Sequence, residues 1–187
     1  MRVFFALPIS SAVKQQLSAQ RAQLARQLSS QSLQWVAAQN YHITLAFLGE
    51  MNRSTMAELI SVAETVVNQH QRLRLSIAEL VWLPSFDNTD FLAASLLESA
   101  PLNALQRHLV NQLALSGVVL PNRSFRPHIT LARAARGVHT SDFTQSPQTI
   151  YTEINELVLF ESQQRSRCSN YQPLHAWLIG DSLQSTH

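Results

Sequence analysis

Apolar residues along the chain follow two different periods. Short runs rich in β-branched and aromatic residues, typical of strands, cover 2–8, 41–50, 73–83, 91–96, 124–134, 154–162 and 171–179, with a shorter extended piece at 35–36. Apolar residues at helical spacing cover 10–30, 54–67 and 101–116. Strands therefore follow strands as well as helices, which predicts an α+β fold with antiparallel hairpins and not a doubly wound parallel sheet.

Local signals indicate where the predicted helices begin and end. Ser54 is a typical N-cap, Pro101 is typical of a first helical turn, and Gly117 is typical of a helix end. Residues 84–90 predict the turn of a hairpin, and a polar loop is expected after residue 134.

The composition describes a globular and weakly basic chain. Of its 187 residues, 45% are hydrophobic and 14% are charged, and the formal net charge is +2. The charged share lies below the average of about 25% for soluble domains. The basic residues form no long block, so the pattern argues against an extended nucleic-acid groove, and an anionic ligand is expected in a local pocket.

The single cysteine, Cys168, excludes an internal disulfide and favours a reducing compartment, so we expect a cytoplasmic protein. The apolar run 3–9 contains Pro8 and is interpreted as a first strand, not as a signal peptide. No segment approaches the ~18 apolar residues that a membrane span needs. The four glycines are too few for a glycine-rich phosphate loop.

The most informative feature is a repeated tetrapeptide. His-Ile-Thr-Leu occurs at 42–45 and again at 128–131, each time in a predicted strand and followed by alanine. Four identical residues can recur by chance, but the shared predicted structure indicates two related halves. Because side chains two positions apart in a strand share a face, histidine and threonine of each copy should point one way. Isoleucine and leucine should pack into the core on the other side.

Two imidazoles and two hydroxyls that face each other are suited to bind and hydrolyse a phosphodiester. A neutral imidazole would take a proton from an attacking water, and an imidazolium would give a proton to the departing oxygen. The hydroxyls would donate hydrogen bonds to the non-bridging oxygens, where charge builds up in the transition state. One histidine on a strand is usually structural, but two matching elements favour a functional interpretation of His42, Thr44, His128 and Thr130. This chemistry requires no metal and no cofactor.

The two motifs, HITLAFLG at 42–49 and FRPHITLAR at 125–133, resemble those of the two-histidine phosphoesterases. Within them, the bacterial and archaeal RNA 2′,3′-cyclic phosphodiesterases, historically called 2′-5′ RNA ligases, are most similar. RVFFALP at 2–8, Trp35 and the closing strands also resemble that family, so the resemblance covers nearly the whole chain. It implies one bilobal domain over residues 1–187, with an antiparallel sheet, outer helices and one motif in each lobe, around a central cleft.

The resemblance implies hydrolysis of a ribose 2′,3′-cyclic phosphate to a 2′-phosphate, with 2′-5′ ligation as the reverse reaction. By position, His42 would protonate the leaving 3′ oxygen and His128 would activate water, although the nearly symmetric motifs alone leave this assignment open. Arg133 resembles the family's arginine at that place and could hold a phosphate bidentately. Strand alternation brings Arg133 to the face of the motif only if the strand ends or bulges before it. Arg126 has the right parity, but it could equally be a solvated charge.

The remaining ring-bearing residues carry weaker signals. Tyr41, Phe47 and Phe125 could stack on a base, although aromatic residues beside core strands are more often packing. Of the other histidines, His70 and His108 are expected in helices at the surface. Neither these two nor His139, His175 and His187 have a spacing that predicts a zinc site. The expected partners are RNA ends or cyclic nucleotides, with no metal and no membrane, and we expect a monomer.

Three alternatives remain open. The chain could hydrolyse ADP-ribose 1″,2″-cyclic phosphate or trim a U-tail, which a substrate panel would reveal. It could be an RNA-binding module with non-catalytic histidines, which turnover by the wild type and loss in His42→Ala would exclude. It could be a metallohydrolase that uses the histidine pair as ligands, which activity in EDTA would exclude.

Overall fold

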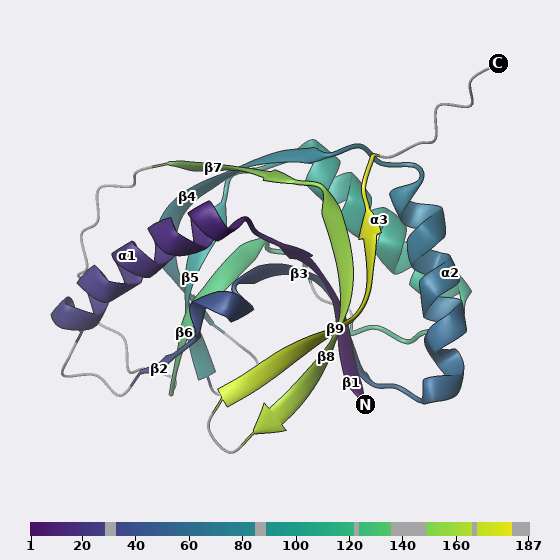
Figure 1. Cartoon of the computed structure of the whole chain (residues 1–187), viewed down its shortest axis with the longest axis horizontal. Coiled ribbons are helices and arrows are strands. Elements are labelled where there is room, and N and C mark those ends of the chain that lie inside the picture. Colours follow the sequence, from purple (N-terminus) through teal and green to yellow (C-terminus); the bar gives the residue numbers. More distant parts are fainter. Residues whose placement is uncertain (29–32, 85–88, 122–123, 136–148, 166–167, 181–187) are drawn as a thin grey trace.

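The computed structural model describes residues 1–28, 33–84, 89–121, 124–135, 149–165 and 168–180 (Figure 1). In chain order its elements are β1 Arg2–Pro8, α1 Ser11–Gln27, β2 Gln34–Trp35, η1 Ala38–Asn40, β3 His42–Glu50, η2 Arg53–Thr55, α2 Met56–Val67, β4 Leu73–Pro84, β5 Thr89–Leu96, α3 Ala100–Leu115, β6 His128–Ala135, β7 Ile150–Ile154, β8 Glu156–Arg165 and β9 Cys168–Leu178. Here η1 and η2 are single 3₁₀ turns. The predicted α+β class is confirmed.

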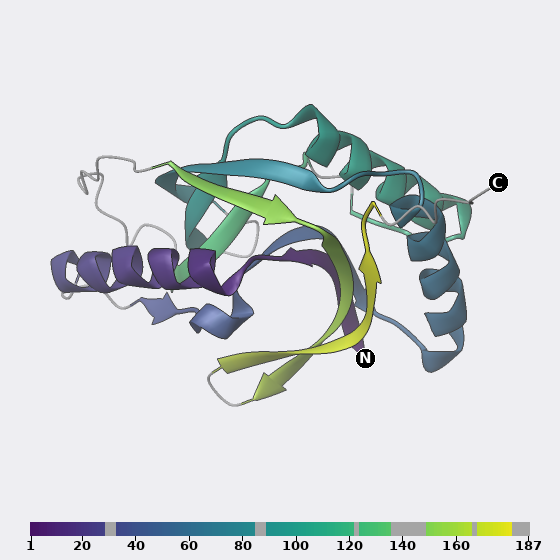
Figure 2. The ribbon, with the colours of Figure 1, turned by 45° about the horizontal axis from the view of Figure 1, so that its top comes forward.

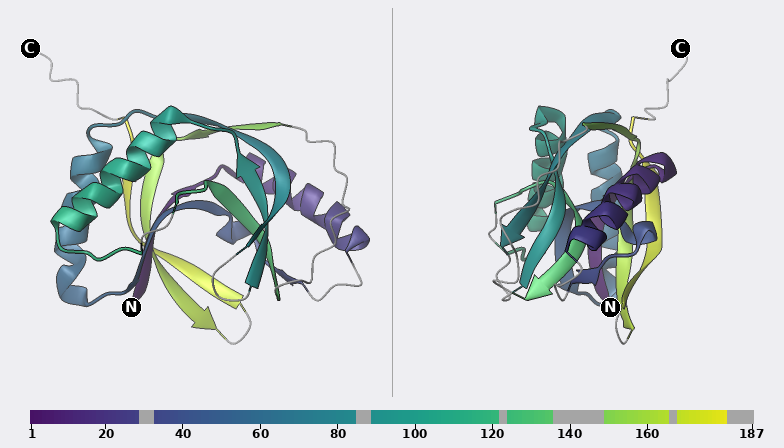
Figure 3. Two further views of the ribbon diagram at one scale, coloured as in Figure 1. Left: turned by 180° about the vertical axis from the view of Figure 1, so that it is seen from behind. Right: turned by 90° about the vertical axis from the view of Figure 1, so that its left-hand side faces the viewer.

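The strands form two antiparallel sheets, and each sheet contains one copy of the repeat. The four-stranded sheet has the order β3-β1-β8-β9, and the five-stranded sheet has the order β2-β6-β5-β4-β7. The first copy opens β3 and the second opens β6, and these two strands contact each other. The helices α2 and α3 pack together at one end of the molecule, and α1 lies at the opposite end (Figures 1 and 3).

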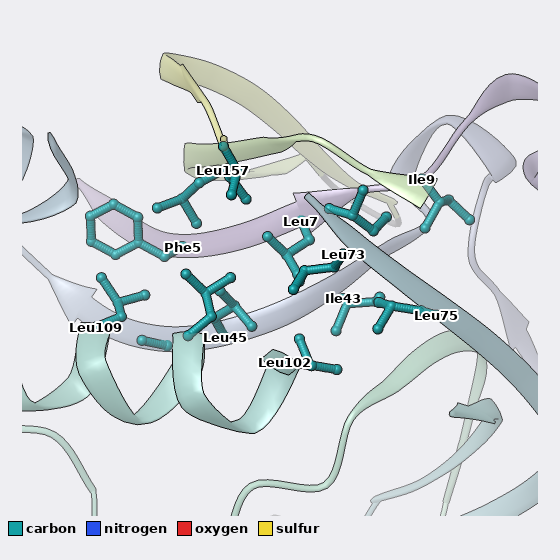
Figure 4. Packing of buried hydrophobic residues seen from close by; sticks show 14 of the residues in the cluster. Phe5, Leu7, Ile9, Ile43, Leu45, Leu73, Leu75, Leu102, Leu109 and Leu157 are labelled. Atoms are coloured by element: carbon teal, nitrogen blue, oxygen red, sulfur yellow. The ribbon is translucent and has the colours of Figure 1, made fainter. Parts of the chain in front are cut away.

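One large apolar core joins both sheets and the helices. In each motif strand the isoleucine and leucine point into it. Ile43 and Leu45 are buried (Figure 4), and so are Ile129 and Leu131. Four leucines at helical spacing bring α3 onto the same core, namely Leu102, Leu105, Leu109 and Leu113. Each such buried side chain contributes about 1.5–3 kcal/mol relative to exposure. The core thus holds the two motif strands against one set of helices.

Helix α1 connects this core to a smaller apolar cluster. Val13 and Leu17 pack into the main core, whereas Leu24 packs against Leu92 and Ala132 of the five-stranded sheet. The predicted helical spacing of these residues is confirmed, and the helix lies along one side of the molecule, as Figure 2 shows. Its first turn follows β1 after two residues, so α1 begins close to the first motif.

Several predicted boundaries differ from the structure. Ser54 is not an N-cap; it lies in the turn η2, and α2 begins only after it. Strand β7 was not predicted, and Ile154, assigned above to the next strand, ends it. β7 pairs with Leu73–Ile77 of β4 on the edge opposite to the one that pairs with β5, so it forms the outer strand of this sheet. The strand predicted at 124–134 begins only at His128.

Other local predictions agree with the structure. Pro101 lies in the first turn of α3, and Gly117 follows its end with φ of 78°, a conformation that glycine adopts without strain. The predicted hairpin is the pair β4 and β5. Most of its turn, and the polar loop expected after residue 134, lie outside the described residues. Among the helices of the described ranges, none has the length and apolar character to cross a membrane.

Candidate active site

The motif strands present histidine and threonine on the side that faces away from the core. His42, Thr44, His128 and Thr130 are all partly exposed, whereas the residues between them are buried. We call these sides of the two sheets the histidine faces. The alternation predicted from the sequence is therefore observed in both copies of the repeat.

Both imidazoles are held in the same way. His42 Nδ1 donates a hydrogen bond of 2.7 Å to the carbonyl oxygen of Asn40, and His128 Nδ1 donates one of 2.7 Å to that of Arg126. Because a carbonyl only accepts, Nδ1 carries the hydrogen and Nε2 holds the free lone pair of the neutral ring. The Thr44 hydroxyl lies 3.0 Å from His42 Nε2, to which it can donate. Each ring thus offers Nε2 for proton transfer.

Burial favours the neutral form of both imidazoles. It lowers the pKa of His42 to about 4, and the bond to the Asn40 carbonyl opposes this only in part. The charges of His128, Lys14 and Arg133 lower the pKa of His42 further, which places these three groups within electrostatic range of one imidazole.

The pKa of His128 is also lowered, chiefly by burial. Its bond to the Arg126 carbonyl raises this pKa, and the Arg126 guanidinium charge lowers it. An anion bound between the rings would oppose these effects and favour protonation of one of them.

A β-bulge brings Arg133 to the histidine face of the five-stranded sheet. Thr130 lies opposite Ala93, and Leu131 is the extra residue of the bulge. Arg133 then lies opposite Phe91, which is on the same side of β5 as Ala93. Simple alternation would have placed Arg133 on the other side, so the condition stated for it from the sequence is met.

The same bulge recurs in the first motif. Thr44 lies opposite Ala6, and Leu45 is the extra residue. Phe47 then lies opposite Phe4, in the place that arginine takes in the second motif. The repeat in structure is therefore longer than the four shared residues, and it ends in phenylalanine on one sheet and in arginine on the other.

Aromatic rings that the sequence reasoning missed surround the histidines. The ring centroid of Phe4 lies 5.1 Å from that of His42, and Tyr171 meets the His42 ring edge-on at 5.2 Å. On the other sheet, the rings of Phe91 and His128 are stacked with centroids 6.4 Å apart. A signal existed in the sequence, because FFA at 4–6 and FLA at 91–93 share the pattern Phe-x-Ala. In both cases the alanine lies opposite the threonine of a motif.

Other sequence-predicted candidates lie in different places. Tyr41 is 1% exposed and belongs to the core, and Phe125 packs against this core. Phe47 is 43% exposed, and its ring stacks on that of Phe4 with 6.3 Å between the centroids. The Arg126 side chain is exposed, and it is the carbonyl of this residue that holds His128.

Among the described residues, the remaining histidines form no recognisable metal site. The expectation of a helical His70 is wrong: it follows α2, and its Nε2 lies 3.1 Å from Nδ1 of His108 in α3. The His175 ring lies against Trp177 with 4.4 Å between the centroids and 37° between the planes, and two others, His139 and His187, lie outside the described residues. The part of the chain that the structure describes contains no group of three or more potential metal ligands of the types His, Cys, Asp and Glu.

Comparisons with known proteins point to one family. The family described as LigT like phosphoesterase matches residues 7–89. An RNA 2′,3′-cyclic phosphodiesterase of Escherichia coli (strain K12) is 28% identical over 189 residues, which cover 95% of this chain and 96% of that protein. One of Geobacillus stearothermophilus is 32% identical over 134 residues, 72% of this chain, and the match spans only 42% of that relative's length.

Solved structures agree with this result. The crystal structure of E. coli LigT complexed with 3′-AMP has a TM-score of 0.78 and 27% identity, covering 95% of this chain and 97% of that one. The crystal structure of a Thermus thermophilus protein, TT0787, has a TM-score of 0.80 at 19% identity, covering 97% of this chain and 100% of that one, and it supports the fold alone.

Proposed function

We propose that this chain, which matches the LigT-like phosphoesterase family over residues 7–89, is a phosphoesterase that hydrolyses RNA 2′,3′-cyclic phosphate ends to 2′-phosphomonoesters. The observation that carries this proposal is the matched pair of imidazoles. Each is held by a backbone carbonyl, each offers Nε2, and their charges interact. The names of the relatives and the 3′-AMP complex of E. coli LigT support a nucleotide ligand.

In the proposed reaction, His128 accepts a proton from water as the water oxygen bonds to phosphorus. The bond from phosphorus to the 3′ oxygen breaks, and His42, as an imidazolium, protonates that oxygen. The phosphate remains on the 2′ oxygen. Which histidine acts as acid follows the resemblance to the family, because the two imidazoles are held alike. Ligation would be the same step with a 5′-hydroxyl in place of water: its oxygen bonds to phosphorus, the bond to the 3′ oxygen breaks, and a 2′-5′ linkage forms.

Three further side chains would bind the phosphate. Thr44 and Thr130 would donate hydrogen bonds to the non-bridging oxygens, and Arg133 would neutralise their charge. Arg126 would contribute a more distant positive charge at the edge of the site. The chemistry uses proton transfers and hydrogen bonds, and in this proposal the protein works as a cytoplasmic monomer of one bilobal domain without a metal ion.

The direct test uses an oligonucleotide that ends in a 2′,3′-cyclic phosphate, incubated in EDTA without ATP. We expect the wild type to release only the 2′-phosphate, and His42→Asn and His128→Asn to lose at least about 100-fold in rate. His175→Asn is the matched control, since this histidine lies against Trp177 in β9 and belongs to neither motif. A 3′-phosphate product would contradict the assigned bond cleavage, and turnover restored only by added metal would favour the metallohydrolase.

A cyclic phosphate of a different nucleotide is the competing substrate. ADP-ribose 1″,2″-cyclic phosphate presents the same five-membered ring to the two imidazoles. The same assay with equal concentrations of both compounds measures the preference. A kcat/KM that is higher for the ADP-ribose compound would overturn the assignment to RNA ends.

A further inference from the structure

Phe91 lies beside both His128 and Arg133, the two groups of the second motif that act on the phosphate in the proposed function. Its ring is nearly parallel to that of His128, with an angle of 18° between the planes and 6.4 Å between the centroids. The guanidinium carbon of Arg133 lies 5.2 Å from the centroid of the same ring. One side chain thus contacts both the imidazole and the cation of the second motif.

The backbone explains how one ring reaches both groups. Phe91 lies directly opposite Arg133 in the pairing of β5 with β6, and His128 lies opposite Ser95, four residues further along β5. Between them is Ala93, opposite Thr130. The methyl group of alanine leaves room for the phenyl ring to lean along the strand toward the imidazole, which a larger side chain would block.

The first motif has the same arrangement. Phe4 lies four residues before Pro8, which is opposite His42, and Ala6 lies between them. The Phe4 ring centroid lies 5.1 Å from that of His42, with 35° between the planes. A phenyl ring from the neighbouring strand beside each imidazole is therefore part of the structural repeat. Recurrence in two sheets argues that the ring supports the imidazole and is not chance packing.

Two contacts determine the direction in which His128 points. The Arg126 carbonyl fixes Nδ1 at 2.7 Å, and this bond alone would still allow the ring to rock about it. A stacked phenyl ring restricts that motion. The attraction between a cation and an aromatic face also restricts the long Arg133 side chain, which would otherwise sample many rotamers.

We propose that Phe91 is a positioning residue that holds the His128 imidazole and the Arg133 guanidinium in one fixed relation to the phosphate. The proposal rests on the proposed function for its kinetic consequence. It does not place Phe91 in contact with the reacting atoms. Misplacing a catalytic group by about 1 Å can cost about 100-fold in rate, so loss of the ring should be visible in turnover.

The test compares Phe91→Leu, which keeps an apolar side chain, with Phe91→Tyr, which keeps the ring. We expect Phe91→Leu to lower kcat/KM about 10- to 100-fold, and Phe91→Tyr to recover most of it. Tyr151→Leu is the control, because it removes an aromatic ring, 78% exposed, from β7 of the same sheet. Thermal unfolding of all three variants identifies any loss that is due to misfolding.

A double-mutant cycle with Arg133→Ala tests whether the ring acts through its neighbours. In the Arg133→Ala protein, Phe91→Leu should cost clearly less than in the wild type. NMR titration of the His128 ring adds a readout that does not need turnover. Water replacing the phenyl ring should raise the pKa of His128 toward its ordinary value, while the other charges near it, on Arg126, Arg133 and His42, are unchanged.

Failure of this proposal and failure of the proposed function give different results. If the wild type hydrolyses no cyclic phosphate, the function is wrong. The titration and the affinity for inorganic phosphate still test the positioning role, since phosphate should bind Phe91→Leu more weakly. If Phe91→Leu keeps its rate within about threefold and the pKa of His128 does not move, the positioning role is wrong. Equal losses in the presence and absence of Arg133 would also overturn it.

Discussion

To act as an acid through Nε2, a histidine must be an imidazolium, whereas His42 is neutral in the free protein at neutral pH. Its pKa of about 4 means that about one molecule in a thousand is protonated there at pH 7. If His42 protonates the leaving oxygen, the substrate itself must supply the missing stabilisation. We therefore predict that binding of a cyclic phosphate is coupled to uptake of a proton by His42.

The size of the effect follows from Coulomb's law. A phosphodiester anion about 4 Å from the imidazolium, at an effective dielectric constant of about 20, contributes about 4 kcal/mol. Since about 1.4 kcal/mol corresponds to one pKa unit, the pKa of His42 should rise to about 7 in the complex. About half a proton per bound substrate should then be taken up at pH 7.

Calorimetry in buffers of different ionisation enthalpy measures this uptake. The His128→Asn protein would bind a nucleoside 2′,3′-cyclic phosphate without turning it over, and the double variant with His42→Asn is its control. We expect uptake by the first protein and none by the second. In the wild type, kcat/KM reports the free protein, so its bell-shaped pH profile should have both limbs below the ordinary histidine pKa of about 6.5.

The profile of kcat, which reports the complex, should lie at higher pH than that of kcat/KM. Absence of proton uptake, together with a kcat/KM profile whose limbs lie above about 6.5, would refute the reasoning. It would mean either that His42 stays neutral and serves as the base, or that burial does not lower its pKa. A kcat profile without the upward displacement would point to the first of these.

Three further results are expected. The folded protein binds fewer protons at His42 than the unfolded chain does, so this group's stabilisation, up to about 3 kcal/mol, is present above about pH 6.5 and lost as the pH falls toward 4. Urea unfolding at pH 7 and pH 4 should show a smaller loss for His42→Asn than for the wild type, and an equal loss would speak against the pKa shift. Thr44→Val removes the hydroxyl beside His42 Nε2 and should lower kcat about 10-fold in steady-state assays with little effect on thermal unfolding; an unchanged kcat would leave this hydroxyl without a catalytic role. Ile129→Ala should cost about 2–5 kcal/mol in urea unfolding because the side chain is fully buried, and a cost below about 1 kcal/mol would contradict the core described above.

The alternation of side chains in the two motifs was predictable because strand geometry is local. The alternation of His42 and Thr44 with Ile43 and Leu45 needs only the period of two that any strand has, and both copies show it. Helix α3 was equally predictable from the sequence, since its leucines recur at helical spacing and Pro101 marks its first turn. Strand β7 could not be found in this way, because only its pairing with one end of β4 makes it a strand.

The sequence by itself determined the class of fold, the two histidine–threonine pairs and the side of each strand on which they lie. Tertiary structure alone decided that Arg133 shares the face of His128, because the bulge before it arises from pairing with β5. It also decided that Phe91 lies against both residues and that the pKa of His42 is about 4. Register, bulges and burial depend on which distant strands meet, whereas alternation along one strand depends only on its own backbone.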